Sequence, residues 1–216
     1  MTETLTTIHL PTIRAWVDGW VISRQAPAPV TEPWGLRVDV GLPGHVARHI
    51  IPDADPATLT RLSTALTAPG TWLKICAPAD AVAPWLAPGW AVQKPEYLMT
   101  IALAPEPAQA PPGYTLAVTT RAGVTVARLL TAAGEVAARG QLAVTRATAV
   151  VDQVETAAGH RRRGLGTVVM RTLTATAASL GARTGVLVAT ADGHALYSTL
   201  GWTLHSPMTA AVLLAP

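Results

Sequence analysis

The sequence predicts a mixed α/β protein, a mixed sheet with helices, built from two similar halves. Runs rich in β-branched residues alternate with segments whose apolar residues recur at helical spacing. A proline-rich segment at 104–113, "APEPAQAPPG", divides the 216 residues nearly in half. Each half contains Ala-Asp and then Gly-Trp at the same separation, with Asp80 and Gly89 in the first and Asp192 and Gly201 in the second. We therefore expect two copies of one supersecondary unit.

The halves are expected to span residues 1–104 and 113–216, joined by an extended, polyproline-like linker at 105–112. In the register of the repeat, the arginine-glycine segment 161–166 aligns with "HIIPDA" at 49–54. The first-half segment contains no glycine, so we expect only the second half to bind an anion there.

Four strands and two helices are expected in the first half. The strands are "WVDGWVIS" at 16–23, "WGLRVDV" at 34–40, "TWLKICA" at 71–77 and "EYLMTIAL" at 96–103, and the helices are 55–66 and 80–86. Asp55 should cap the first of these helices, with Pro56 at its first helical position.

The second half should begin with a strand at 114–120. A hairpin over 135–145 that turns near Gly140 should come next, and the β-branched run 148–156 should form a strand. The remaining elements are a helix at 164–180, a strand at 184–190, a helix at 191–200 stopped by Gly201, and a terminal strand region at 202–214 broken at Pro207.

Composition excludes several classes of protein. Half of the residues are hydrophobic and 13% are charged, which excludes disorder, yet no apolar run is long enough to span a membrane. The N-terminal residues lack the pattern of a secretory signal, so we expect a cytoplasmic protein without membrane partners. A net charge of +3 is too small to indicate nucleic acid, and the arginine triplet lacks a wider basic stripe and neighbouring aromatic residues.

Neither the cysteine nor the closely spaced histidines predict a metal site. Cys76 is the one cysteine of the sequence, and we expect it to be a buried hydrophobic residue. His45 and His49 are four residues apart, but no third ligand accompanies them, so no metal is expected.

Three consecutive arginines, Arg161, Arg162 and Arg163, precede two glycines at the start of the helix expected at 164–180. A strand, a glycine turn and a helix start present unpaired N–H groups at a positive dipole end, where a pyrophosphate is stabilised. Glycine lets oxygen atoms approach closely, and arginine adds charge-assisted donors. A solvated basic turn is the alternative.

The context of this loop resembles the GCN5-related N-acetyltransferase (GNAT) superfamily. The R-x-x-G-x-G arrangement matches the loop that holds the pyrophosphate of acetyl-CoA in that family. A downstream pattern, usually Asn-x-x-Ala-x-Tyr and then Gly-Phe, is matched by Asp192, Ala195, Tyr197, Gly201 and Trp202, with Asp replacing Asn and Trp replacing Phe. The resemblance covers about residues 147–207 and implies two tandem GNAT-like halves, of which the first is degenerate.

The resemblance also implies which residues bind acetyl-CoA, the expected cosubstrate. They are Val154, Glu155, Thr156, Arg161, Arg162, Arg163, Gly164, Leu165, Gly166, Thr167, Asp192 and Tyr197. Backbone groups from Val154 to Thr156 would pair with the pantetheine arm and supply the oxyanion donor.

Catalysis would need an acid and a base. The family places a tyrosine near the sulfur, which makes Tyr197 the acid candidate. Asp152 lies at the position that is often acidic in the family, with Glu155 in reserve and a water chain as a further route. Regular strand alternation would place Asp152, Val154 and Thr156 on one face, with Glu155 on the other.

The sequence thus predicts an N-acetyltransferase that moves an acetyl group from acetyl-CoA to a primary amine of a small molecule by direct attack. A non-catalytic acyl-CoA sensor or pseudoenzyme is the alternative. Six of the seven tryptophans lie in the first half, where one or two could line an acceptor pocket between the halves. Nothing in the sequence indicates an oligomeric state.

Overall fold

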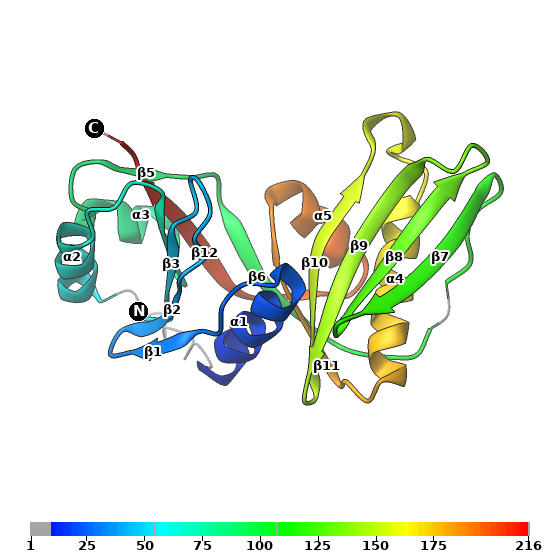
Figure 1. Cartoon of the computed structure of the whole chain (residues 1–216), viewed down its shortest axis with the longest axis horizontal. Coiled ribbons are helices and arrows are strands. Elements are labelled where there is room, and N and C mark those ends of the chain that lie inside the picture. Colours follow the sequence, from blue (N-terminus) through cyan, green and yellow to red (C-terminus); the bar gives the residue numbers. More distant parts are fainter. Residues whose placement is uncertain (1–9, 54, 107, 216) are drawn as a thin grey trace, which may run out of the picture.

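A computed structural model describes residues 10–53, 55–106 and 108–215. Its architecture is mixed α/β, as predicted, and most strands belong to one long, twisted sheet (Figure 1). The strand order is β1-β2-β3-β4-β12-β6-β11-β10-β9-β8-β7, and β5 pairs with β12.

The first half of the chain supplies the left part of Figure 1. Its elements are α1 (Leu10–Arg24), β1 (Val30–Glu32), β2 (Gly35–Val38), β3 (Ala47–Ile51), α2 (Pro56–Ala65), β4 (Thr71–Ile75), α3 (Ala79–Val82), the 3-10 turn η1 (Ala83–Trp85), β5 (Trp90–Val92) and β6 (Glu96–Ala102). The predicted cap of α2 is confirmed, because an Asp55 carboxylate oxygen accepts the Thr58 N–H at 2.8 Å and Pro56 is the first helical residue.

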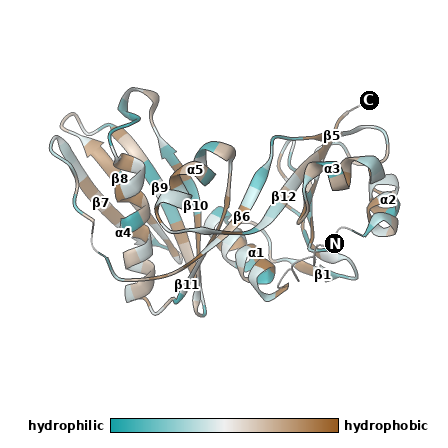
Figure 2. Ribbon diagram, turned by 180° about the vertical axis from the view of Figure 1, so that it is seen from behind, coloured by the Kyte–Doolittle hydropathy of each residue, from teal (hydrophilic) through white to brown (hydrophobic). Residues whose placement is uncertain are grey.

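The second half supplies the right part of Figure 1. Its elements are β7 (Tyr114–Arg121), β8 (Val124–Thr131), β9 (Val136–Thr145), β10 (Thr148–Thr156), the 3-10 turn η2 (Ala158–His160), α4 (Leu165–Ser179), β11 (Thr184–Ala189), α5 (Ala191–Thr199) and β12 (Thr203–Leu213). Seen from behind in Figure 2, α4 lies across the strands of this half, and hydrophobic residues recur on the helix and on β8.

The strand expected at 16–23 is wrong, because these residues belong to helix α1. Ile13, Trp16, Val17 and Trp20 are buried at helical spacing, so the aromatic and β-branched residues form one face of a helix rather than a strand. Gly19 lets the helix approach the sheet closely, because a Cβ there would lie 2.4 Å from Val150 Cγ2.

The hairpin expected at 135–145 is also wrong, because β9 runs unbroken through Gly140. A Cβ at Gly140 would lie 2.8 Å from Val169 Cγ1 and 3.0 Å from Leu173 Cδ1, so the glycine permits close packing of α4 and makes no turn. The chain turns earlier, where Gly134 adopts a left-handed backbone conformation with φ 82°.

The terminal strand is not broken at Pro207. β12 continues to Leu213, with a shift of register between Leu204 and Ser206. Residues 203–208 pair with β6, and residues 209–212 pair with β4. Pro207 therefore lies in a part of the strand with a partner on one side, where a missing N–H is tolerated.

The final strands of the two halves are exchanged. β6 pairs with β11 of the second half, and β12 pairs with β4 of the first half, so the sheet is continuous across the halves. Each half also contains two parallel strands joined by a helix, β3-α2-β4 in one and β10-α4-β11 in the other. The division at 105–112 stays a prediction, and Pro107 lies outside the described residues.

Helix α1 packs between the halves. Its buried side chains form one core with residues of both, including Leu36 and Ile50 from the first half and Val186 from the second. A separate core lies between α4, α5 and the other face of the second half, and a third lies beneath α2. The second-half sheet is thus covered by α1 on one face, called the α1 face below, and by α4 on the other, called the α4 face.

Candidate active site

Strands β10 and β11 pair only at their beginnings. Thr148 to Val150 of β10 face Thr184 to Val186 of β11, and no later pair forms between these two described strands. Gln153 has a left-handed backbone with φ 52°, and Gln153 and Val154 together oppose Gly140 of β9. This β-bulge bends β10 and leaves backbone groups facing the widening gap between the strands.

The bulge also changes which side chains share a face, so the predicted alternation is wrong. Val154 Cγ2 lies 3.1 Å from the Cβ position of Gly140, which places Val154 on the α4 face. Asp152 instead contacts α1, and Glu155 lies opposite Arg139, on the same face as Asp152. Both candidate carboxylates therefore lie on the α1 face.

The arginine-glycine loop leads directly into α4. Gly164 adopts a left-handed conformation with φ 75° and provides no side-chain cap. The N–H groups of the first turn, Leu165 to Thr167, have no acceptor within the helix, and they face the end at which the helix dipole is positive. A Cβ at Gly166 would lie 3.1 Å from Leu196 Cδ2, so this glycine allows α5 to pack against the loop.

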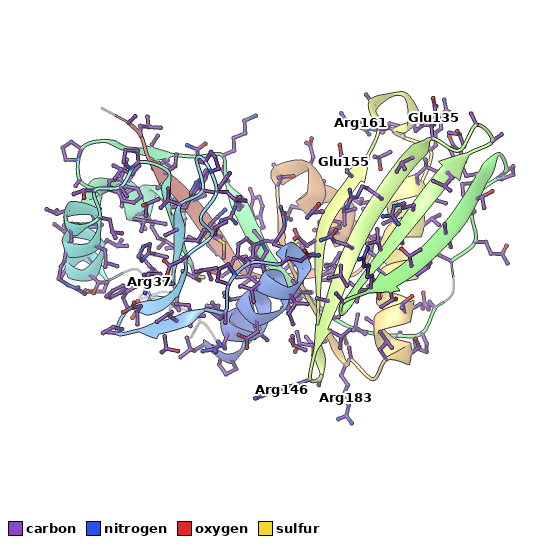
Figure 3. All side chains as sticks on the ribbon, viewed as in Figure 1. Arg37, Glu135, Arg146, Glu155, Arg161 and Arg183 are labelled. Atoms are coloured by element: carbon purple, nitrogen blue, oxygen red, sulfur yellow. The ribbon has the colours of Figure 1, made fainter. Side chains whose placement is uncertain are left out.

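The three arginines are exposed around this helix start. Arg161 Nε donates to the Thr156 carbonyl at 3.3 Å, and Arg162 has a left-handed backbone with φ 60°. Figure 3 places Arg161 and Glu155 at the same end of the second half. Arg163 Nη1 donates to the Tyr114 hydroxyl at 3.1 Å, which ties the loop to β7.

Tyr114 was not foreseen as part of the loop. Its hydroxyl lies 2.9 Å from His160 Nδ1 as well as near Arg163, although β7 is far from the loop in the sequence. No local pattern marks such a contact, so sequence reasoning could not have found it.

Tyr197 projects from α5 into the core between α4 and the sheet. Burial raises its pKa to about 12, and the negative charge of Asp152 contributes in the same direction. The phenol therefore keeps its proton at neutral pH. Asp192, by contrast, is exposed in the first turn of α5, where the Thr190 hydroxyl accepts the Gly193 N–H at 3.3 Å.

Asp152 is held by α1. Arg24 Nη2 donates to one carboxylate oxygen at 2.9 Å and Arg24 Nε donates to the other, to which Ser23 Oγ also donates at 3.1 Å. Gln141 Nε2 in turn donates to Ser23 Oγ at 2.9 Å. Sequence reasoning missed Arg24 because it placed residues 16–23 in a strand.

Further charged residues lie on the same face in the first half. Lys74 Nζ forms an ion pair with Glu96 at 2.6 Å, and burial lowers the pKa of Lys74. The Arg48 guanidinium lies 4.6 Å from the centre of the Trp20 ring. Burial lowers the pKa of Arg48, and the charge of Arg24 lowers it further.

His45, His49 and Cys76, for which the sequence predicts no metal site, lie apart from the arginine-glycine loop. His45 stacks on Trp72 at 5.0 Å, whereas the His49 ring lies 6.1 Å from Trp34, so the two histidines have separate surroundings. Cys76 is buried as predicted, and burial raises its pKa to about 12.

The family is decided by a match between residues 80–202 and the Acetyltransferase (GNAT) family. The chain belongs to the GNAT acetyltransferase family. Members of this family transfer an acyl group from acyl-CoA to an acceptor, and the matched region contains the bulged β10, the arginine-glycine loop and Tyr197. No helix among the described residues is long and apolar enough to cross a membrane.

Solved structures of GNAT proteins share the fold. A GCN5-related N-acetyltransferase from Kribbella flavida is 15% identical with a TM-score of 0.64, and the match covers 100% of this chain and 98% of that one. A putative GNAT-family acetyltransferase from Novosphingobium aromaticivorans is 20% identical with a TM-score of 0.60, covering 96% and 99%. A tandem GNAT protein from the clavulanic acid biosynthesis pathway is 14% identical with a TM-score of 0.51, covering 67% and 65%. No curated protein matches the sequence.

Proposed function

We propose that the protein is an N-acetyltransferase that transfers an acetyl group from acetyl-CoA to a primary amine of a small molecule. The observation that carries this proposal is the partly unpaired β10 beside the uncapped start of α4, with Tyr197 close by. Each feature suits a different part of the cosubstrate.

The arginine-glycine loop has the charge and the free N–H groups needed to bind the pyrophosphate of acetyl-CoA. The free N–H groups from Leu165 to Thr167 point toward the helix start, and Arg161 and Arg162 supply positive charge that no carboxylate among the described residues neutralises in an ion pair. Asp55 occupies the corresponding start of α2 in the first half. Its carboxylate would repel a phosphate, which supports cofactor binding by the second half alone.

The bulged strand suits the pantetheine arm. Backbone groups of β10 near Val154 and Thr156 face the gap beside β11 and can pair with the amides of the arm, as a neighbouring strand would. A backbone N–H in this stretch would also donate to the oxygen of the thioester carbonyl, where negative charge develops during attack.

Proton transfer is assigned to Tyr197 and to a carboxylate on the α1 face. As the amine nitrogen bonds to the thioester carbon and the carbon–sulfur bond breaks, Tyr197 donates its proton to the departing sulfur. Asp152 already accepts hydrogen bonds from Arg24 and Ser23, so taking a proton would weaken that ion pair. Glu155 is exposed on the same face, and we assign it as the base, acting directly or through water.

Isothermal titration with acetyl-CoA tests the cofactor site. Wild-type protein should bind at micromolar concentration, and the double variant Arg161→Ala, Gly164→Glu should not. The matched control is Arg183→Ala, Gly181→Glu, which makes the same charge change at the other end of α4, where Gly181 is also left-handed with open space around it. Equal binding by both double variants, or no binding by the wild type, would contradict the proposal.

A non-catalytic acyl-CoA sensor is the second candidate, favoured by the engagement of Asp152 in an ion pair. Release of CoA thiol with any primary amine separates the two functions. Acetyl-CoA binding without turnover of any amine would favour the sensor.

A further inference from the structure

Three cationic side chains lie near Asp152 and Glu96: Arg24 at the end of α1, Arg48 in β3 and Lys74 in β4. Arg24 is paired with Asp152 and Lys74 is paired with Glu96. Within the described part of the chain, Arg48 has no carboxylate within ion-pair distance. It is therefore the cation of this group that is still able to bind an anion.

The surroundings of Arg48 leave donors unused. Its Nε is buried and has no acceptor among the described residues, while Nη2 lies 3.5 Å from His45 Nδ1. The guanidinium lies over Trp20, which leaves its N–H edge for other partners. A buried donor without an acceptor costs free energy, so an anion that accepts from this edge would be stabilised.

The charge around Arg48 is positive. Burial lowers the pKa of His45, and the positive charges of Arg48, Lys74 and Arg24 lower it further, so these cations disfavour a positive charge on His45. An anion entering here would meet one guanidinium without a counter-ion.

Arg48 is connected to the proposed reaction site through Asp152. The negative charge of Asp152 partly offsets the lowering of the Arg48 pKa by burial, and it adds to the raising of the Tyr197 pKa by burial. Arg48 projects from β3 toward α1, and α1 holds Asp152 through Arg24. A ligand on Arg48 would therefore lie on the α1 face, where Asp152 and Glu155 also lie.

We propose that Arg48 binds a carboxylate of the acceptor, so that the acceptor is an amino acid or another primary amine that bears a carboxylate. This inference rests on the proposed acetyl transfer and adds the substrate class. A guanidinium edge matches the two oxygens of a carboxylate, so Arg48 can hold the carboxylate at two points. Arg48 holds the carboxylate end of the acceptor, while the amine at the other end of the acceptor reaches the thioester.

Matched pairs of amines test this proposal. Each pair contains a carboxylate and its neutral amide: glycine and glycinamide, β-alanine and β-alaninamide, 4-aminobutyrate and 4-aminobutyramide, phenylalanine and phenylalaninamide. Thiol release is measured at saturating acetyl-CoA. In at least one pair, the wild type should prefer the carboxylate by about tenfold or more in kcat/KM, the size expected of a charge-assisted contact.

Three variants assign that preference to Arg48. Arg48→Met keeps the apolar stem on Trp20 and should abolish the preference through a higher KM, whereas Arg48→Lys keeps the charge without the planar edge and should retain part of it. Arg61→Met is the control, because Arg61 also lies over a tryptophan, Trp34 at 5.7 Å, but on α2. It should leave the preference unchanged.

The outcomes separate this inference from the proposed function. A wild type without carboxylate preference in any pair, or a preference that survives in folded Arg48→Met, would overturn the role of Arg48. If Arg48→Met does not fold, an undiminished preference for the carboxylate in Arg48→Lys would overturn the proposed contact through the planar guanidinium edge. Failure of the wild type to bind acetyl-CoA in the separate titration would instead remove the proposed function, and this inference with it.

Discussion

Arg24, the last residue of α1, forms a two-point ion pair with Asp152 in the middle of β10, 128 positions away in the sequence. The pair joins the N-terminal helix to the strand that contains the bulge. It is partly buried, since the side chain of Asp152 is 14% exposed and that of Arg24 is 41% exposed. Its contribution should therefore exceed that of an exposed ion pair.

Replacing Arg24 should destabilise the protein by leaving Asp152 without its cation. We expect Arg24→Met to lower the free energy of unfolding by about 1–2 kcal/mol, between the values for exposed and buried pairs. Urea unfolding measures the change. Arg14→Met, which breaks the exposed pair with Asp18, should cost less than about 1 kcal/mol. A loss no greater than that of the control would show that the pair with Asp152 stabilises the protein no more than an exposed ion pair does.

Removing the Tyr197 hydroxyl should slow catalysis without weakening cofactor binding. Tyr197→Phe should lower kcat by about 100-fold or more, because a general acid contributes about that much, while the Kd for acetyl-CoA stays unchanged. Since the pKa of Tyr197 is about 12, its proton is retained to at least pH 10. A kcat in Tyr197→Phe equal to that of the wild type would exclude this role.

Alkaline pH should destabilise the fold through Cys76 and Tyr197. Burial raises the pKa of Cys76 from 9.0, and that of Tyr197 from 10.0, to about 12 in each case. Between the unfolded and folded pKa values the unfolded chain binds fewer protons, so the free energy of unfolding falls as pH rises, by about 1.4 kcal/mol per pH unit for each group. Stability from these groups is complete below pH 9 and is lost as pH approaches 12.

Urea unfolding at pH 8, 9.5 and 10.5 would measure this slope. Cys76→Ala should be less stable than the wild type at pH 8 but should lose less stability between pH 8 and 9.5, because Cys76 ionises first. Identical slopes in the two proteins would contradict the assignment to Cys76.

Adding a methyl group to α1 at Gly19 should destabilise the protein, although alanine ordinarily favours a helix. A Cβ at this position would lie 2.4 Å from Val150, so we expect Gly19→Ala to cost about 1–3 kcal/mol. Val150→Ala in the same chain should recover part of this loss by removing the contacted methyl groups. Gly159→Ala, with open space around its Cβ, should change stability little. A stabilised Gly19→Ala would show that α1 can move away from β10.

The sequence was most informative where a short segment determines its own structure. The Asp55 cap, the strand at 148–156 and the helix after Gly164 all follow from neighbouring residues, and the structure contains each of them. The family was likewise recognisable from two motifs close together in the sequence. Gly140 was misread because a glycine in a strand can mark a turn or a close approach, and only the position of α4 distinguishes the two.

The features missed depend on packing between distant segments. The bulge at Gln153 places Asp152 and Glu155 on one face, whereas simple alternation separates them. α1 was misread because Trp and Val are typical of strands, and the helix is stabilised by burial against both halves. The residues that now define the α1 face, Arg24 and Arg48 among them, have no local signature of function.

The exchange of β6 and β12 bears on how the protein forms during synthesis. The first half emerges from the ribosome before β12, the strand that lies beside β4, has been made. Its sheet therefore stays incomplete until β12 is released, even though translation of its other strands ended more than a hundred residues earlier. Domains usually fold in the order in which they are made, but here the earlier half depends on the later one. A ribosome that stalls within the second half would leave the edge of β4 exposed to pairing with other chains.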